Sequence, residues 1–162
     1  MQYVLVIVID NGKNRLMKLT LNETLNKAVD LHRQGNIEDA VCLYEEILLA
    51  HPKDPDVNHN MGLILINSGK TSEALPLLWT ALEANPDEWQ FWLSYIDALI
   101  QANQLANAQI MYDAARKAGA VGEVFDEIAN RLVIPLEKKL LSSPKVKLSC
   151  VARMYDLASH AL

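Results

Sequence analysis

The apolar positions of residues 21–122 follow a helical spacing that repeats every 34 residues. Met61, Gly62 and Leu65 form one face of a helix, and Trp92, Ile96 and Leu99 form the matching face further along the chain. Residues spaced by three or four positions lie on the same side of an α-helix. Three blocks follow from this period, residues 21–54, 55–88 and 89–122, and each is expected to hold two helices.

The turn inside each block is marked by a residue that tolerates the left-handed conformation. Gly35 and Gly69 are 34 residues apart, and Asn103 stands at the third equivalent position. Glycine and asparagine commonly end a helix in this way. Pro52 and Pro86 then close the first two blocks, because proline does not continue a helix.

The second helix of each block carries the same apolar series. Small residues let two helices approach closely, and bulky neighbours fill the adjacent groove. The series consists of Ala40, Ala74 and Ala108, then Tyr44, Leu78 and Tyr112, then Ile47, Ala81 and Ala115.

Two blocks depart from the common pattern. In the first, Thr24 and Lys27 replace large apolar residues, as expected of a terminal repeat that faces solvent. The third ends in Ala118, Gly119 and Ala120 instead of a proline, so its last turn should differ.

In this register the sequence resembles the tetratricopeptide (TPR) family. The second block, NHNMGLILINSGKTSEALPLLWTALEANP, matches the family pattern well, and the flanking blocks match it in large part. The resemblance implies an all-α, right-handed solenoid of three helix-turn-helix repeats, TPR 1 (21–54), TPR 2 (55–88) and TPR 3 (89–122). Residues 123–141 should form a capping helix, which Pro135 should kink or interrupt.

The two ends of the chain differ from the repeats. Residues 1–20 begin with the β-branched run MQYVLVIVID, which is compatible with a strand that adds to a sheet edge, a disordered leader, or residues upstream of a start at Met17. We favour the last two. Residues 142–162 form a basic amphipathic tail with apolar Leu148, Val151 and Tyr155; it is expected to fold back, fray or dock on a partner.

Charge and composition narrow the class of function. Residues 1–130 carry a net charge of −9 and residues 131–162 one of +4, so nucleic acid is not expected as the partner. The apolar run at the start is too short to cross a membrane, and Cys42 and Cys150 show no metal-binding or redox spacing. We expect a cytoplasmic protein, with Cys42 reduced and buried in a helix.

The resemblance implies that the first helix of each repeat lines a concave groove. Transferred by position, the groove residues share an exposed place on a first helix. They are Asn22, Leu25, Asn26, Val29, Arg33, Asp56, His59, Asn60, Leu63, Asn67, Gln90, Leu93, Ser94, Asp97 and Gln101.

Asn26, Asn60 and Ser94 follow the 34-residue step and should stand in a row along this groove. An asparagine amide offers a donor and an acceptor together, so it can hold a peptide unit without reading its side chain. The row is similar to the asparagine ladder of O-GlcNAc transferase-type superhelices, including bacterial Spindly-like glycosyltransferases. The alternative is that Asn26 and Asn60 are ordinary exposed helix residues with no role in binding. The Lys and Arg residues of a chaperone carboxylate clamp are not matched.

No catalytic motif is apparent, and no metal or cofactor is expected. His32 and His59 are interpreted as bystanders, and Trp79, Trp89 and Trp92 as core or rim residues. The sequence therefore predicts a non-enzymatic adaptor that binds an extended segment of another protein. Alternatives are a self-association scaffold, in which the basic tail forms a homodimer or fills the acidic groove, and the non-catalytic portion of a glycosyltransferase.

Overall fold

A computed structural model describes the chain path of residues 3–10 and 13–141 and the side chains of residues 19–132. Expectations for the tail 142–162 lie outside the described residues. Two strands come first, β1 (Tyr3–Asp10) and β2 (Lys13–Thr20). The helices that follow are α1 (Leu21–Arg33), α2 (Ile37–Ala50), α3 (Pro55–Asn67), α4 (Thr71–Ala84), α5 (Trp89–Gln101), α6 (Leu105–Lys117) and α7 (Glu123–Leu141).

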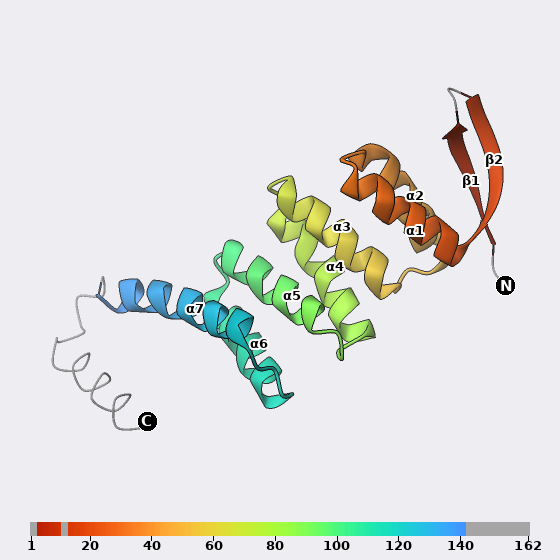
Figure 1. Ribbon diagram of the computed structural model, residues 1–162. Helices are drawn as coiled ribbons and strands as arrows, with labels where there is room; N and C mark the ends of the chain where they lie inside the picture. The colour runs from red at the N-terminus through yellow and green to blue at the C-terminus, as the bar shows by residue number, and fades with distance from the viewer. Residues whose placement is uncertain (1–2, 11–12, 142–162) are drawn as a thin grey trace.

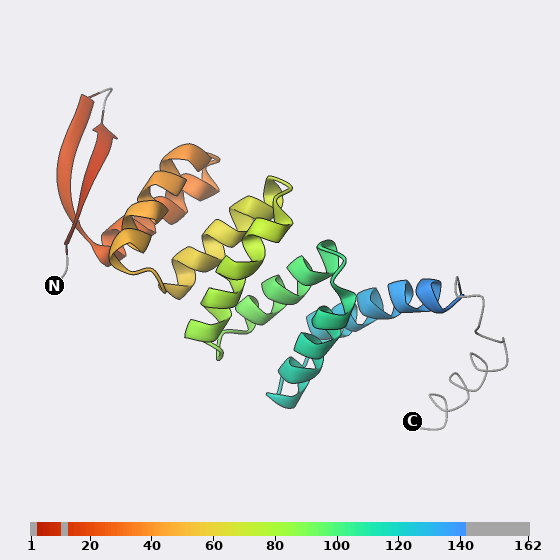
Figure 2. The ribbon, with the colours of Figure 1, turned by 180° about the vertical axis from the view of Figure 1, so that it is seen from behind.

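The helices form antiparallel hairpins that stack in a row from α1 to α7 (Figures 1 and 2). Helix α1 packs on α2, α3 on α4 and α5 on α6, and each hairpin contacts the next through its second helix. Neighbouring hairpins thus share a continuous core, as expected of an all-α solenoid. The expected fold class is confirmed for the helical part of the chain.

The turns between paired helices share one geometry. Gly35, Gly69 and Asn103 have φ angles of 84°, 75° and 57°, which confirms the left-handed turns expected from the sequence. The backbone N–H of the next residue then bonds to a carbonyl five residues earlier, at 2.9 Å from Asn36 to Leu31 and 2.8 Å from Lys70 to Leu65. This closure satisfies carbonyls that a helix end leaves free.

Alanine at the expected crossing positions lets the helices approach closely. Ala40, Ala74 and Ala108 are fully buried. The tightest contact lies in the second repeat, where a Cβ added to Gly62 would stand 2.7 Å from Leu78 Cγ and Leu78 Cδ2. The same position holds Ala28 in the first repeat and Ile96 in the third, both fully buried. The hairpins therefore share a plan but differ in their detailed packing.

The N-terminal segment forms a hairpin, which differs from the favoured interpretation of it as a disordered leader. β1 pairs antiparallel with β2 from Tyr3 opposite Thr20 to Asp10 opposite Lys13. A strand that adds to a sheet edge was one of the alternatives for residues 3–10. The strand that they pair with is the next segment of the same chain. Met17 lies in the second strand, which ends at Thr20 directly before α1. Both strands contact α1.

Two further expectations were wrong. Thr24 is fully buried, and its hydroxyl is satisfied by a 3.0 Å hydrogen bond that it donates to the Thr20 carbonyl within the capped first turn of α1. Its position is thus part of the core and does not face solvent. Cys42, expected to be buried, is exposed, because the buried face of α2 is made by Ala40, Leu43 and Tyr44.

Helix α7 extends the stack beyond the third repeat. Phe125, Ile128 and Leu132 are buried in the same cluster as Ile96 and Leu99 of α5. The helix continues from Glu123 to Leu141, so Pro135 does not interrupt it. Since proline removes only one backbone donor and mainly disturbs the preceding turn, a helix held by packing can continue through it.

Candidate binding face on the first helices

Helices α1, α3 and α5, the first helices of the repeats, lie along one side of the stack. Ala28 of α1 and Ile64 of α3 belong to one buried cluster, α3 contacts α5, and α5 contacts α7. Helix α7 therefore occupies the place that the first helix of a further repeat would take. We name the surface of α1, α3 and α5 that carries the fifteen expected groove residues the inner face.

Most of the expected residues on the inner face are accessible, and many of them carry amides. Those exposed are Asn22, Asn26, Arg33, Asp56, Asn67, Gln90 and Gln101, and those of intermediate exposure are Leu25, Val29, Asn60, Leu63, Leu93 and Asp97. Side-chain amides thus alternate with partly buried aliphatic groups along the three helices.

Two of the expected groove residues are buried instead. His59 on α3 and Ser94 on α5 are 8% and 7% exposed, and His59 Nε2 is hydrogen-bonded to Ser94 Oγ at 2.8 Å. The imidazole also packs against the Phe91 ring, with centroids 4.8 Å apart. Because α3 and α5 are in contact, this pair joins two repeats. Neither group is free to bind a ligand, which corrects the expectation for these two positions.

Burial sets the ionisation of the groups around this pair. Removal from water lowers the pKa of His59, while Glu88 opposes the shift. Partial desolvation raises the pKa of Asp56 even though its side chain is exposed, and its neighbours Asp54 and Glu88 raise this pKa further. His59 is therefore held neutral at neutral pH, which suits a residue that links two helices by a hydrogen bond.

Helix α7 adds a residue that the sequence reasoning missed. Arg131 pairs with Asp97 Oδ1 on α5, and Gln101 Nε2 donates a 2.8 Å hydrogen bond to Asp97 Oδ2. Asp97 thus joins α5 to α7 at the end of the inner face. Only the general expectation that residues 123–141 cap the last repeat hinted at such a contact.

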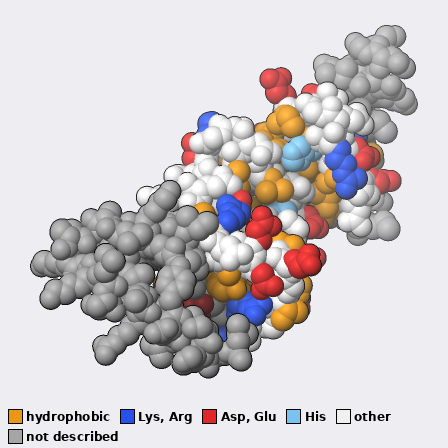
Figure 3. Space-filling model, turned by 60° about the vertical axis from the view of Figure 1, so that its left-hand side comes forward, with side chains coloured by type: hydrophobic (Ala, Val, Ile, Leu, Met, Phe, Trp, Pro, Cys, Tyr) orange, Lys and Arg blue, Asp and Glu red, His pale blue; other side chains and the backbone are white. Residues whose placement is uncertain are grey.

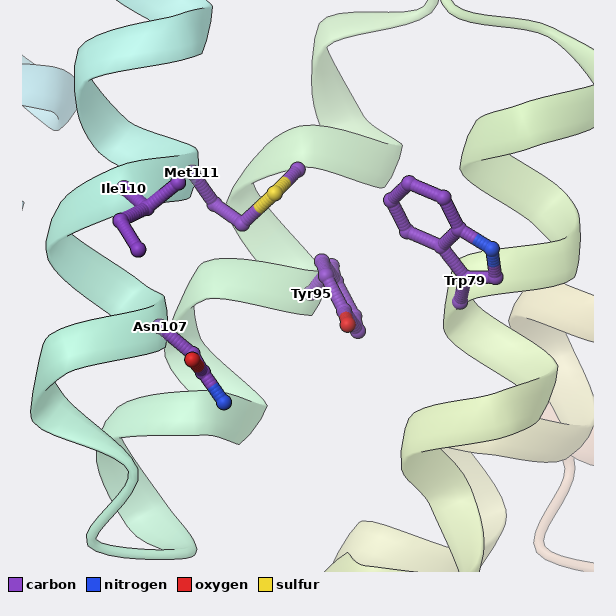
Figure 4. A pocket seen from close by; sticks show the side chains of 5 residues that line it. All are labelled: Trp79, Tyr95, Asn107, Ile110 and Met111. Atoms are coloured by element: carbon purple, nitrogen blue, oxygen red, sulfur yellow. The ribbon is translucent and has the colours of Figure 1, made fainter.

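The structure also contains a cleft away from the inner face. Trp79 of α4, Tyr95 of α5 and Asn107, Ile110 and Met111 of α6 line it (Figure 4). The sequence placed Trp79, Trp89 and Trp92 in the core or its rim. Trp92 fits this, since its Nε1 donates a 2.8 Å hydrogen bond to the Pro86 carbonyl, whereas Trp79 is 42% exposed.

The part of the surface in Figure 3 mixes histidine, aliphatic and charged groups over the described helices. Acidic and basic side chains lie near one another on this face, with apolar patches between them.

In the described part of the chain, none of the helices has the length and apolar character required to span a membrane.

Part of the repeat region matches a known protein family. Residues 59–123 match the family model described as "Tetratricopeptide repeat". This part of the chain is therefore similar to tetratricopeptide repeats. The matched region runs from the first helix of TPR 2 to the start of α7, and the same helix geometry extends to α1 and α2. No curated protein sequence matches the chain.

Solved structures share the fold of these repeats at low sequence identity. The complex of the TPR2B domain of yeast Sti1 with pHsp70 is 20% identical, covers 71% of this chain and 97% of its own, and has a TM-score of 0.62. The first TPR of Spaghetti (RPAP3), bound to an Hsp90 peptide, is 15% identical, with coverages of 72% and 93% and a TM-score of 0.65.

A bacterial structure shows the same arrangement. The Yersinia enterocolitica type III secretion chaperone SycD, in complex with a peptide of the translocator YopD, is 21% identical. The match covers 76% of this chain and 95% of that one, with a TM-score of 0.59. At these identities the likeness establishes the solenoid fold of the helical region and no more.

Proposed function

We propose that the inner face binds an extended segment of another protein, which makes the chain an interaction module. The observation that carries this proposal is the accessible set of amides on α1, α3 and α5. Asn26 and Asn60 occupy equivalent positions 34 residues apart, and both reach the surface. Each amide can donate to a peptide carbonyl and accept from a peptide N–H.

Apolar side chains between the amides would supply contact area. Leu25, Leu63 and Leu93 are each partly accessible, so a bound segment could cover them and remove more apolar surface from water. Main-chain hydrogen bonds and aliphatic contacts recognise an extended backbone, so the site should show little preference for the sequence of the peptide. We expect micromolar affinity, because ordering a flexible segment offsets part of the contact energy.

The structural neighbours support this assignment by analogy of fold. The Sti1 domain, the RPAP3 domain and SycD were each solved with a peptide or partner bound. Fold alone does not transfer a ligand, and the residues on the inner face here differ from a basic carboxylate clamp. Asp97, moreover, is already paired with Arg131.

The finer resemblance to the asparagine ladder of O-GlcNAc transferase-type repeats rests on Asn26 and Asn60. The third position of that row, Ser94, is bonded to His59. We therefore place the peptide grip on the first two repeats, with Asn22 and Asn67 as flanking amides. None of the contacts described favours the alternative that the chain is the non-catalytic portion of a glycosyltransferase.

The test selects ligands from a phage-displayed library of random peptides and measures their affinity for the full chain by fluorescence anisotropy. Changing Asn26 and Asn60 together to Ala should weaken binding about tenfold or more, since each lost hydrogen bond contributes about 1 kcal/mol. Helix content and melting temperature should stay within error of the parent chain.

The matched control changes two exposed asparagines outside the inner face, Asn36 before α2 and Asn85 at the end of α4, to Ala. This variant should bind the selected peptides like the parent chain. Selection of no peptide, or equal weakening by the two double variants, would contradict the proposed binding face.

A further inference from the structure

The cleft lined by Trp79, Tyr95, Asn107, Ile110 and Met111 lies away from the inner face and is formed mainly by second helices. It has a volume of about 340 Å³. In Figure 4 the Trp79 and Tyr95 rings approach it from α4 and α5, and Ile110 and Met111 from α6. Ile110 is 64% exposed, and the Trp79 and Tyr95 ring centroids are 5.5 Å apart.

The repeat provides an internal comparison for this cleft. Trp79 stands where the first repeat has Glu45 and the third has Asp113, and all three side chains are exposed. At the position of Asn107 the second repeat has Glu73. The equivalent surface between α2 and α4 is thus charged. An exposed tryptophan at a position that is otherwise acidic has no role in the core of its own hairpin, and such aromatic residues commonly anchor protein contacts.

The charge of the second helices indicates what kind of segment fits. Helix α4, which carries Trp79, contains two acidic residues and no Lys or Arg. Helix α6, on the other side of the cleft, carries Asp113, with Arg116 and Lys117 in its last turn. Glu83 lies one turn after Trp79 on the same side of α4, and Glu45 and Asp113 flank Trp79 in the neighbouring repeats. A partner should therefore insert apolar side chains and carry basic residues beside them.

The chain itself contains such a segment in residues 145–162. Leu148, Val151 and Tyr155 recur at helical spacing. Lys145 and Lys147 precede them, Arg153 lies between Val151 and Tyr155, and Asp156 is the single acidic residue of the segment. This pattern predicts an amphipathic helix with an apolar stripe and a basic flank. Tyr155 and Leu148 are side chains of the kind that an aromatic cleft accepts.

We propose that the segment 145–162 of one copy docks in the Trp79 cleft of a second copy. Helix α7 leads away from α4 in both views (Figures 1 and 2). Residues 142–144 alone separate its end from the segment, and three residues span at most about 10 Å. A second copy can instead present its cleft directly to the segment, and reciprocal exchange gives a two-fold symmetric dimer.

This dimer contact leaves the inner face unoccupied. It differs from a tail that fills the groove on the first helices, because it uses the opposite helix of each repeat. The same chain could then bind a partner segment on the inner face while it is held as a pair through the second helices.

Sedimentation equilibrium of the full chain at micromolar concentration tests the proposal. The parent chain should be a dimer. Trp79→Glu, which installs the residue type of the first repeat, and Tyr155→Asp in the segment should each raise the dimer dissociation constant about tenfold or more, as expected for loss of an interface anchor. Higher salt should also weaken the dimer, because the flanking charges are exposed.

Leu49→Glu is the matched control, since Leu49 is 85% exposed on α2 and the change introduces the same charge outside the cleft. It should leave the dimer intact. Far-UV circular dichroism checks that Trp79→Glu keeps its helices. If it does not, Tyr155→Asp decides, because Tyr155 is not one of the residues of α1–α7.

Three outcomes would overturn the proposal. One is a parent chain that is monomeric at every concentration. Another is equal dissociation in Leu49→Glu and Trp79→Glu. The third is a dimer unaffected by Trp79→Glu that retains its helices. Failure here is distinguishable from failure of the peptide site, because Trp79→Glu should still bind peptides selected on the inner face.

Discussion

Gly62 offers a sensitive probe of how closely the helices of the second repeat pack. A methyl group added there would lie 2.7 Å from Leu78 Cγ and Leu78 Cδ2, closer than carbon atoms approach without a shift. Leu78 is fully buried, so it has little room to move. We therefore expect Gly62→Ala to destabilise the chain, although alanine favours a helix more than glycine does.

The expected size follows from two opposing contributions. Alanine in place of glycine within a helix stabilises by about 1 kcal/mol, whereas overpacking a filled core costs about 1–3 kcal/mol. The net loss should be about 1 kcal/mol, which corresponds to a fall in melting temperature of about 2–4 °C for a domain of this size. Urea unfolding followed by circular dichroism measures it.

A second substitution tests the cause. Leu78→Ala removes both contacting atoms and should itself cost about 2–5 kcal/mol. In that background Gly62→Ala should become stabilising by about 1 kcal/mol, because only the gain in helix propensity remains. The control Ala28→Gly, at the equivalent buried position of the first repeat, should destabilise. The reasoning is refuted if Gly62→Ala stabilises the otherwise unchanged chain.

Three further substitutions test other contacts. Tyr44 is fully buried and its hydroxyl has no partner among the described residues, so Tyr44→Phe should raise the free energy of unfolding by about 1 kcal/mol; a loss would reveal a hydrogen bond. Burial lowers the pKa of His59, so the unfolded chain takes up the proton first and stability should fall as the pH drops below about 6.5. His59→Gln should flatten that fall in urea melts, and an unchanged slope would count against the buried neutral imidazole. Gly69 has a φ of 75°, so Gly69→Ala should lower the melting temperature by an amount equivalent to about 1 kcal/mol, and no change would contradict the left-handed turn.

The period of the sequence was sufficient to predict the helical architecture. Gly35, Gly69 and Asn103 have the left-handed conformation, and the alanines at the helix crossings are buried. These features depend on residues a few positions apart within one hairpin, so local pattern determines them. The contacts between hairpins depend on residues that no local pattern pairs.

The inner face shows where such prediction stops. Position alone placed His59 and Ser94 in the groove, but the contact between α3 and α5 buries both side chains. The pairing of Arg131 with Asp97 depends on how α7 crosses α5, which the sequence period does not specify. Likewise, β1 forms a hairpin only because β2 pairs with it, and the polar and basic residues of β2 resemble a loop that leads into a helix.

The cleft was also hidden from the sequence reasoning. Trp79 was interpreted as a core or rim residue because Trp79, Trp89 and Trp92 have helical spacing around the junction of the second and third repeats. Its place in the repeat would have shown the difference, since Glu45 and Asp113 occupy the equivalent positions. Comparing outward positions across repeats, as well as core positions, is the signal that could have found it.

The central claim is that the first helices form the surface that receives a partner segment. The most direct measurement is the change in backbone amide shifts of the ¹⁵N-labelled chain on addition of a peptide selected against it. If a partner segment binds there, the signals of Asn26, Asn60 and Leu63 should move, while those of Glu45 on α2 and Asp113 on α6 should stay in place. Shifts confined to α2, α4 and α6 would contradict it.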